Sequence, residues 1–218
     1  MTKICVFDLD GTLINTLENI AGHMNKTLAS YGLPTFPVDR FRYFVGNGAR
    51  NLTKQVLEAS GKMTPEFYEE FFSRFIVAYE GAPYDGVAPY EGITAMLKAL
   101  KEKGIVLAVC SNKPHAAAVA SVESLLPAGL FDEVLGGRDG VPLKPAPDAV
   151  LALLEKHGFS REEAAFIGDS DVDMKTAVAA GIRGYGALWG FRTKDELLAA
   201  GATALLSRPE ELVACISE

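Results

Sequence analysis

The sequence predicts an α/β fold: a doubly wound, Rossmann-like parallel-sheet core with a small all-helical domain inserted near its start. Two observations predict it. From about residue 89 onward, short apolar runs alternate with stretches of helical periodicity. Residues 15–82 instead contain only helical patterns, so they are expected to form a compact unit of their own.

The first strand is expected at the apolar run that begins at Ile4, and it ends in two carboxylates. At the period of a β-strand, Asp8 and Asp10 point the same way. Close carboxylates raise one another's pKa and repel unless a cation or a shared proton offsets the charge. The pair therefore indicates a metal site. The alternative is an ordinary Asp-Gly turn, although such a turn needs only one Asp.

The inserted unit is predicted from three helical patterns. The first begins near Asn15 and ends at Gly32, and the others cover about residues 48–60 and 64–79. A hinge back to the core is expected at Gly81–Pro83. The predicted domains are a core made of residues 1–14 and 83–218, and a helical domain made of residues 15–82.

The remainder of the core is predicted as alternating strands and helices. The apolar run over residues 105–110 is typical of a strand buried on both faces. Further strands are expected at residues 133–135, 164–167, 184–188 and 204–206. Helices are expected at about residues 91–103, 115–126, 147–157, 172–180, 194–200 and 209–217.

The composition indicates which partners and which cellular compartment to expect. The net charge of −7 comes without a basic cluster, so no nucleic-acid polymer is expected as a partner. No apolar run approaches the ~20 residues of a membrane span, and the N-terminus enters a strand directly, so neither a membrane segment nor a signal peptide is expected. Three cysteines far apart in the chain fit reduced thiols in a cytoplasm. The three histidines have no zinc-ligand spacing.

Polar groups follow three of the predicted strands. In open α/β sheets ligands bind beyond the carboxyl ends of the strands, so these groups are expected to converge. The polar segments are Asp8–Thr12, Ser111–Lys113 and Gly168–Asp173, joined by Lys144 in a loop before a helix.

These segments, in this order, resemble the haloacid dehalogenase superfamily of phosphotransferases. Its motifs are D-x-D-x-T, a Ser or Thr after the second strand, a Lys, and G-D-x-x-x-D, and all four occur here. The resemblance includes a helical cap domain inserted after the first motif. The stretches Ser111–Pro114, Leu188–Gly190 and Gly201–Ala202 are most similar to those of phosphoglycolate phosphatases and related small-substrate phosphatases.

The resemblance implies roles for the two aspartates of the first motif, and elementary chemistry agrees with them. Asp8 is expected to attack phosphorus and form an aspartyl-phosphate. Its alternative role is that of a metal ligand only. Asp10 is expected to protonate the leaving alkoxide and then activate water. Its main-chain carbonyl is expected to bind the metal as well.

The other motif residues are expected to hold metal and phosphate. The expected ligands of Mg²⁺ are Asp8, Asp10 and Asp169, with Asp173 holding the site more indirectly. The phosphoryl group is expected to meet the Ser111 hydroxyl, the Asn112 amide N–H and the Lys144 ammonium. On its own, Ser111 would be a turn hydroxyl and Lys144 a solvated lysine.

Two further residues are expected near the substrate. Thr12 is predicted to orient the loop through hydrogen bonds. The glycine loop Gly46–Arg50 of the cap is predicted to face the cleft, where Arg50 could pair with a carboxylate of the substrate. The alternative is a glycine turn with Arg50 in solvent.

The sequence thus predicts a Mg²⁺-dependent phosphatase of a small phosphorylated metabolite, with 2-phosphoglycolate the best single choice. A β-phosphoglucomutase-like sugar-phosphate mutase is the alternative, because the motifs and the cap type are shared. A dehalogenase fits less well, since its chemistry does not need Asp10 as an acid. A catalytically inactive binding module stays open in principle. The protein is expected to be a monomer or a homodimer.

Overall fold

A computed structural model of the protein describes residues 1–81, 84 and 86–216. Its centre is a parallel sheet of order β5-β4-β1-β6-β7-β8, which confirms the predicted α/β class. β1 lies in the middle, paired in parallel with β4 on one side and β6 on the other. The strands are β1 (Ile4–Phe7), β4 (Val106–Pro114), β5 (Glu133–Gly137), β6 (Ala164–Gly168), β7 (Arg183–Ala187) and β8 (Ala204–Leu206).

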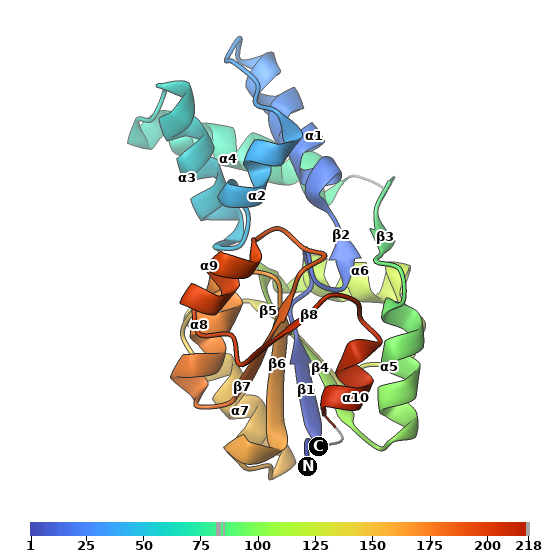
Figure 1. The fold of residues 1–218 in the computed structure, drawn as a ribbon. Coiled ribbons are helices and arrows are strands. Elements are labelled where there is room, and N and C mark those ends of the chain that lie inside the picture. Colours follow the sequence, from blue (N-terminus) through green and yellow to red (C-terminus); the bar gives the residue numbers. More distant parts are fainter. Residues whose placement is uncertain (82–83, 85, 217–218) are drawn as a thin grey trace.

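Helices cover both faces of the sheet (Figure 1). One face carries α5 (Ile93–Glu102), α6 (His115–Leu125) and α10 (Glu211–Cys215); the other carries α7 (Asp148–His157), the short η2 (Arg161–Glu163), α8 (Asp171–Ala180) and α9 (Lys194–Ala199). Side chains of β1 alternate between two hydrophobic clusters: Cys5 and Phe7 pack with α5, while Ile4 and Val6 pack with α7. The sheet is therefore buried on both sides, as its apolar strands predict.

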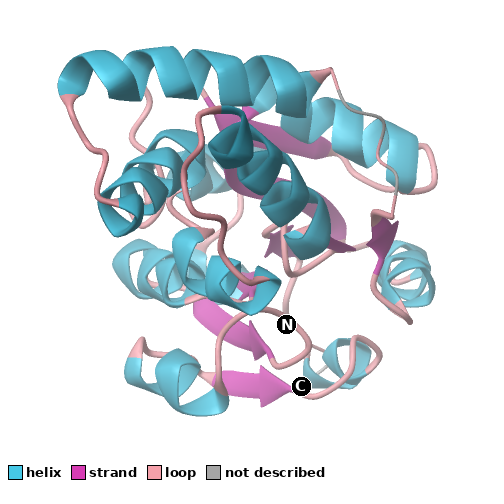
Figure 2. Ribbon diagram, turned by 90° about the horizontal axis from the view of Figure 1, so that it is seen from above, coloured by secondary structure: helices cyan, strands magenta, loops and turns pink. Residues whose placement is uncertain are grey.

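A group of helices lies over the carboxyl ends of the strands, as Figures 1 and 2 show from two directions. Its members are α1 (Leu17–Ser30), η1 (Val38–Arg40), α2 (Phe41–Phe44), α3 (Gly48–Ser60) and α4 (Pro65–Glu80). They share a hydrophobic cluster that includes the buried rings of Phe41, Phe71 and Phe75. We call this group of helices the helical insert.

A small antiparallel ribbon lies where the chain passes between sheet and insert. It pairs β2 (Ile14–Asn15) with β3 (Ala88–Pro89). The ribbon and the short helices between residues 38 and 44 were not expected from the sequence, because such short elements have too few residues to show periodicity. The expected hinge at Gly81–Pro83 falls partly outside the described residues, since 82 and 83 are not among them. No helix in the described part of the chain is long and apolar enough to cross a bilayer.

Candidate active site

The site begins at a tight turn that follows β1. The backbone N–H groups of Leu13 and Ile14 both donate to the carbonyl of Leu9, at 2.9 and 3.1 Å. Gly11 has a φ of 92°, in the left-handed region that favours glycine, and a Cβ there would lie 2.4 Å from Asp169 Oδ2. The turn therefore needs glycine both for its backbone conformation and for its contact with the neighbouring carboxylate.

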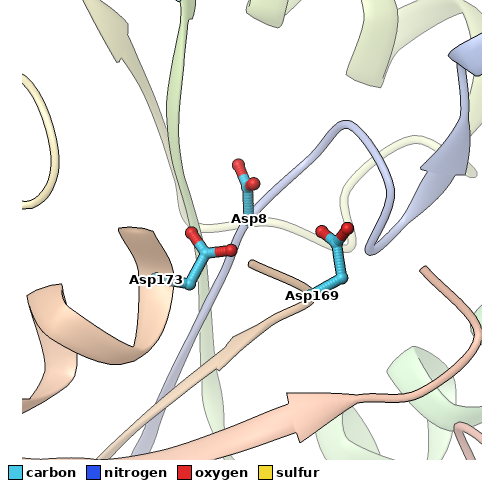
Figure 3. A group of neighbouring side chains, drawn as sticks. All are labelled: Asp8, Asp169 and Asp173. Atoms are coloured by element: carbon cyan, nitrogen blue, oxygen red, sulfur yellow. The ribbon is translucent and has the colours of Figure 1, made fainter. Parts of the chain in front are cut away.

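Three aspartates converge beside this turn, at the carboxyl ends of neighbouring strands (Figure 3). Asp8 follows β1, Asp169 follows β6, and Asp173 lies in the first turn of α8. All three are buried, and one carboxylate oxygen from each lies within 4.8 Å of the others. The parallel order places β1 next to β6, so two segments 160 residues apart in sequence meet at one edge.

Hydrogen bonds fix two of these carboxylates. Asp169 Oδ1 accepts from the Thr12 hydroxyl at 2.8 Å, and its Oδ2 accepts from the Phe191 N–H at 2.8 Å. Asp173 Oδ2 accepts from the hydroxyl of Ser170 at 2.6 Å and from its N–H at 3.0 Å. Ser170 is the N-cap of α8, so helix capping and the site share these atoms.

The ammonium of Lys144 contacts the carboxylates of both Asp8 and Asp173. Its Nζ is 2.9 Å from Asp8 Oδ1 and 2.7 Å from Asp173 Oδ1, and only 3% of its side chain is exposed. The contact with Asp173 has hydrogen-bond geometry. Asp8 Oδ1 is close to the ammonium but makes no aligned hydrogen bond, so it is a buried oxygen with spare capacity for a ligand.

The crowding of carboxylates appears in their proton affinities. Burial, followed by the charge of Asp173, raises the pKa of Asp8 to about 7, although Lys144 opposes the shift. Burial and the charges of Asp173 and Asp8 raise the pKa of Asp169 to about 8. One ammonium thus does not compensate three buried carboxylates.

The residues fit a hard divalent cation. The donor set is oxygen only, which Mg²⁺ prefers, and Asp8 Oδ1 is a buried oxygen without an aligned hydrogen bond. Asp173 uses both oxygens on Lys144 and Ser170, so Asp8 and Asp169 are better placed than Asp173 to bind an ion directly. The side chain of Asp10 lies outside this cluster.

Asp10 faces a second lysine instead. Lys113 Nζ lies 3.0 and 3.3 Å from the two carboxylate oxygens of Asp10, and 2.5 Å from the hydroxyl of Tyr79. Tyr79 belongs to α4 of the helical insert, whereas Lys113 belongs to β4. Each aspartate of the first motif therefore has a lysine of its own: Lys144 lies beside Asp8, and Lys113 lies beside Asp10.

Ser111 and Asn112 lie on β4, buried beside the same site. The Asn112 side chain joins two loops: its Nδ2 donates to the carbonyls of Gly46 and Lys144, and its Oδ1 accepts from the Lys144 N–H at 2.8 Å. It therefore fixes the Lys144 loop against the insert. Ser111 Oγ accepts from the Lys113 N–H at 3.2 Å and borders the same cavity as Asp8 and Asp10.

The structure does not bring Arg50 to the carboxylates. Its side chain is 62% exposed and pairs with Glu69 at 3.1 Å, and its guanidinium lies over the ring of Phe72. Arg50 borders a different hollow from the one that contains Asp8. Gly46 and Gly48, from the same loop, do line the cavity at Asp8.

Sequence reasoning gave no role to the loop after β7, which joins the insert to the site. Phe191 donates to Asp169 through its backbone while its ring packs in the hydrophobic cluster of the insert. Arg192 donates to the carbonyls of Arg42 and Val45 in the insert. Arg42 in turn donates to the Gly190 carbonyl at 2.9 Å. An aromatic and an arginine after Leu188–Gly190 were the only signals that the sequence offered.

Comparison with known proteins identifies the family of this chain. Residues 5–187 match the family model described as haloacid dehalogenase-like hydrolase. The phosphoglycolate phosphatase of Aquifex aeolicus is 36% identical over 211 residues, covering 97% of this chain and 95% of the relative. That of Rhodospirillum rubrum is 34% identical and covers 94% of this chain and 87% of the relative.

A solved structure has the same fold as this chain. It is that of a predicted phosphoglycolate phosphatase from Haemophilus somnus, with a TM-score of 0.92 and 27% identity, covering 98% of this chain and 97% of the other. The resemblance drawn from the four motifs is thereby confirmed. The chain belongs to the haloacid dehalogenase-like hydrolase family.

Proposed function

We propose that this protein is a Mg²⁺-dependent phosphatase that hydrolyses a small phosphomonoester, with 2-phosphoglycolate as the best single substrate. The observation that carries the proposal is the buried cluster of Asp8, Asp169 and Asp173 with Lys144 against it. Family membership agrees with hydrolase chemistry, and relatives named phosphoglycolate phosphatase cover nearly the whole chain.

In the first step, a carboxylate oxygen of Asp8 attacks phosphorus and the bond from phosphorus to the ester oxygen breaks. The leaving oxygen takes a proton from Asp10, which gives a free alcohol and an aspartyl-phosphate. Asp8 borders the cavity, and its carboxylate has two oxygens, so one can face a cation while the other attacks phosphorus.

In the second step, Asp10 removes a proton from water as the water attacks phosphorus. The bond between phosphorus and the Asp8 oxygen breaks, and inorganic phosphate leaves. Both steps divide one difficult hydrolysis into two easier displacements. Asp10 regains the proton that it gave up, so the enzyme returns to its starting state.

The surrounding residues have supporting roles in this proposal. Lys144 and the Ser111 hydroxyl hold the transferring phosphoryl oxygens, together with an N–H of Asn112. Thr12 holds Asp169 rather than the substrate, as its hydrogen bond to that carboxylate supports. When bound by Asp8, Asp169 and the Asp10 carbonyl, with Asp173 behind them, Mg²⁺ supplies charge compensation for the carboxylates and the phosphoryl group.

We also propose that residues 15–82 act as a cap domain on a core made of residues 1–14 and 83–218. Support comes from the separate hydrophobic cluster of the helical insert and from its position over the strand ends. Gly46, Leu52 and Phe75 of the insert line the cavity at Asp8, so the insert is placed to exclude water from the reaction. Arg50 has no part in this proposal, because its side chain is exposed and pairs with Glu69.

The test is phosphate release by purified, Mg²⁺-loaded protein across a panel of small phosphomonoesters that includes 2-phosphoglycolate. The wild-type protein should release phosphate, and Asp8→Asn should lower turnover by at least about a thousandfold, because the amide is not a nucleophile. Circular dichroism and a thermal melt should show that Asp8→Asn is folded.

Two results would contradict the proposal. A folded, metal-loaded protein that releases no phosphate from any ester would exclude the phosphatase function. Retained turnover in Asp8→Asn would exclude Asp8 as the nucleophile. A sugar-phosphate mutase would instead convert a sugar phosphate to its isomer faster than it releases phosphate, so both products should be measured.

A further inference from the structure

A cavity lies between the sheet and the helical insert. Asp8, Asp10 and Ser111 line it from the sheet side. The insert side is mostly apolar and includes Ile20, Leu52 and Phe75. Among the described residues that line this cavity, Lys113 is the only one with a cationic side chain.

Lys113 is held in place from both sides of the cavity. Its ammonium lies 3.0 Å from Asp10 Oδ1 and 2.5 Å from the Tyr79 hydroxyl, and it sits 5.0 Å from the centre of the Tyr79 ring. Only 4% of the Lys113 side chain is exposed. The ammonium of Lys113 is paired with the carboxylate of Asp10, so the group is a cation.

Tyr79 brings a second polar group to the same point. Its hydroxyl oxygen accepts from Lys113, which leaves the hydroxyl hydrogen available to an acceptor in the cavity. Burial raises the pKa of Tyr79 above its usual value, so the hydroxyl keeps its proton at neutral pH. Lys113 and Tyr79 together present two donors to one small anion.

The position of Lys113 and Tyr79 next to Asp10 indicates which part of the substrate they would meet. In the proposed reaction Asp10 protonates the oxygen that leaves phosphorus. In a 2-phosphoglycolate-like ester, the carboxylate is attached to the carbon that bears this oxygen. The group that binds the carboxylate must therefore be a close neighbour of Asp10, and Lys113 is in direct contact with it.

We propose that Lys113 Nζ and Tyr79 Oη form the binding site for the carboxylate of the substrate, and so select phosphomonoesters that carry an acid group beside the ester oxygen. This proposal rests on the proposed phosphatase function. A carboxylate in this position would be bound by a charge-assisted hydrogen bond in a place that excludes water, where such bonds are strong. The wall that the insert gives to the cavity is mostly apolar, so it has few polar groups that could bind an uncharged polar substituent in place of the carboxylate.

The experiment compares 2-phosphoglycolate with ethyl phosphate, which has the same ester oxygen and a methyl group in place of the carboxylate. The ratio of their kcat/KM values reports carboxylate recognition alone, because any disturbance of Asp10 affects both esters. We expect the wild-type ratio to favour 2-phosphoglycolate. Lys113→Met should lower the ratio by about 10- to 100-fold, the worth of a hydrogen bond to a charged group.

A second variant and a control keep the result interpretable. Tyr79→Phe removes only the hydroxyl and should lower the ratio by about 3- to 10-fold, as for a neutral hydrogen bond. It decides the question if Lys113→Met does not fold. Lys54→Met is the matched control, since Lys54 lies on the surface of α3 with a side chain 55% exposed, and it should leave the ratio unchanged.

The outcomes separate this proposal from the proposed function. If both variants lower the two kcat/KM values equally, Lys113 serves only to orient Asp10 and the carboxylate site is overturned. A wild-type protein that hydrolyses both esters without preference also overturns it, while the phosphatase function stands. If the wild-type protein hydrolyses neither ester nor any other in the panel, the proposed function itself has failed.

Discussion

Asp8 and Asp10 are two residues apart, yet the fold gives them different surroundings. Asp8 is buried beside Asp169, Asp173 and the Lys144 ammonium. Asp10 is turned away from that cluster toward Lys113. Asp8 precedes the tight turn after β1, whereas Asp10 lies inside that turn, which is closed by hydrogen bonds to the Leu9 carbonyl. The two carboxylates therefore have different electrostatic surroundings.

The raised pKa values predict how stability depends on pH when no metal is bound. Asp8 and Asp169 have pKa values of about 7 and about 8 in the folded protein, against an ordinary value of 3.8. At pH values between the ordinary and the raised pKa, the folded state therefore holds more protons than the unfolded state. Stability therefore falls as pH rises from about 4 to about 8. Thermal melts in EDTA should show a falling melting temperature over this interval.

Adding Mg²⁺ should reverse the loss, because the cation offsets the carboxylate charges and binds the folded state only. The rise in melting temperature on adding Mg²⁺ should grow with pH over the same interval. Asp169→Asn removes one carboxylate of the cluster and should abolish most of this rise. A Mg²⁺ effect that is absent, or equal at every pH and unchanged in Asp169→Asn, would contradict the assignment of the cluster.

Residue type and strand position were enough to predict that Asp8 and Asp169 would meet, since parallel strands end at one edge. The same reasoning brought the segment Ser111–Lys113 to this edge, without showing that Lys113 would pair with Asp10, and it could not place Arg50, which lies on a helix of the insert. A helix near a cleft presents some side chains to it and others to solvent, and packing decides which. Arg50 points to Glu69 and solvent, whereas Lys113 is buried against Asp10.

At the scale of elements, the loop after β7 and the short helix α2 bind each other. Arg192 donates to the carbonyls of Arg42 and Val45, and Arg42 donates back to Gly190. The ring of Phe191 is buried in the insert while its N–H holds Asp169. One short loop thus fixes both the insert and a carboxylate of the candidate metal site.

This connection predicts the effect of Arg192→Gln. The substitution removes a buried cation that serves two carbonyls, so unfolding should need about 1.5–3 kcal/mol less free energy. Because Phe191, whose N–H holds Asp169, directly precedes Arg192, the position of Asp169 should also loosen and Mg²⁺ should bind more weakly. Urea unfolding and a Mg²⁺ titration followed by the melting temperature would measure the two effects.

The matched control is Arg208→Gln. The Arg208 side chain is 70% exposed and pairs with Glu210 and Glu211 at the surface, so its loss should change stability by less than about 0.5 kcal/mol. If Arg192→Gln behaves like Arg208→Gln in both measurements, the loop does not couple the insert to the site.

Element prediction failed where local pattern and tertiary pairing disagree. The strand expected at residues 105–110 extends as β4 to Pro114, so Ser111, Asn112 and Lys113 lie within it. Polar residues and a proline are not typical of a strand; here the register with β5 shifts between Cys110 and Pro114, and the pairing resumes at Pro114 with Gly137. Such pairing is a property of the assembled sheet, which no local window of sequence contains.

At the scale of the molecule, the chain builds a sheet with a hydrophobic cluster on each face and a helical insert with a cluster of its own, and the cavity at Asp8 lies between sheet and insert. Phe191, from the later part of the chain, joins the cluster of the insert. Alternation of strands and helices predicted the sheet, and helical periodicity predicted the insert. How closely the two approach is decided by a few contacts, such as Tyr79 with Lys113 and Asn112 with Gly46.

The central claim is that Asp8 carries the phosphoryl group during turnover. The direct measurement is a rapid acid quench of the Mg²⁺-loaded protein during turnover of 2-phosphoglycolate that carries a radioactive phosphorus atom. One part of the sample is counted for the label, and another is reduced with borohydride for peptide analysis. A reduced aspartyl-phosphate becomes homoserine, so we expect an acid-stable, base-labile label and homoserine at position 8, both absent in Asp8→Asn. Turnover with the label on another residue, such as Ser111, would contradict the account.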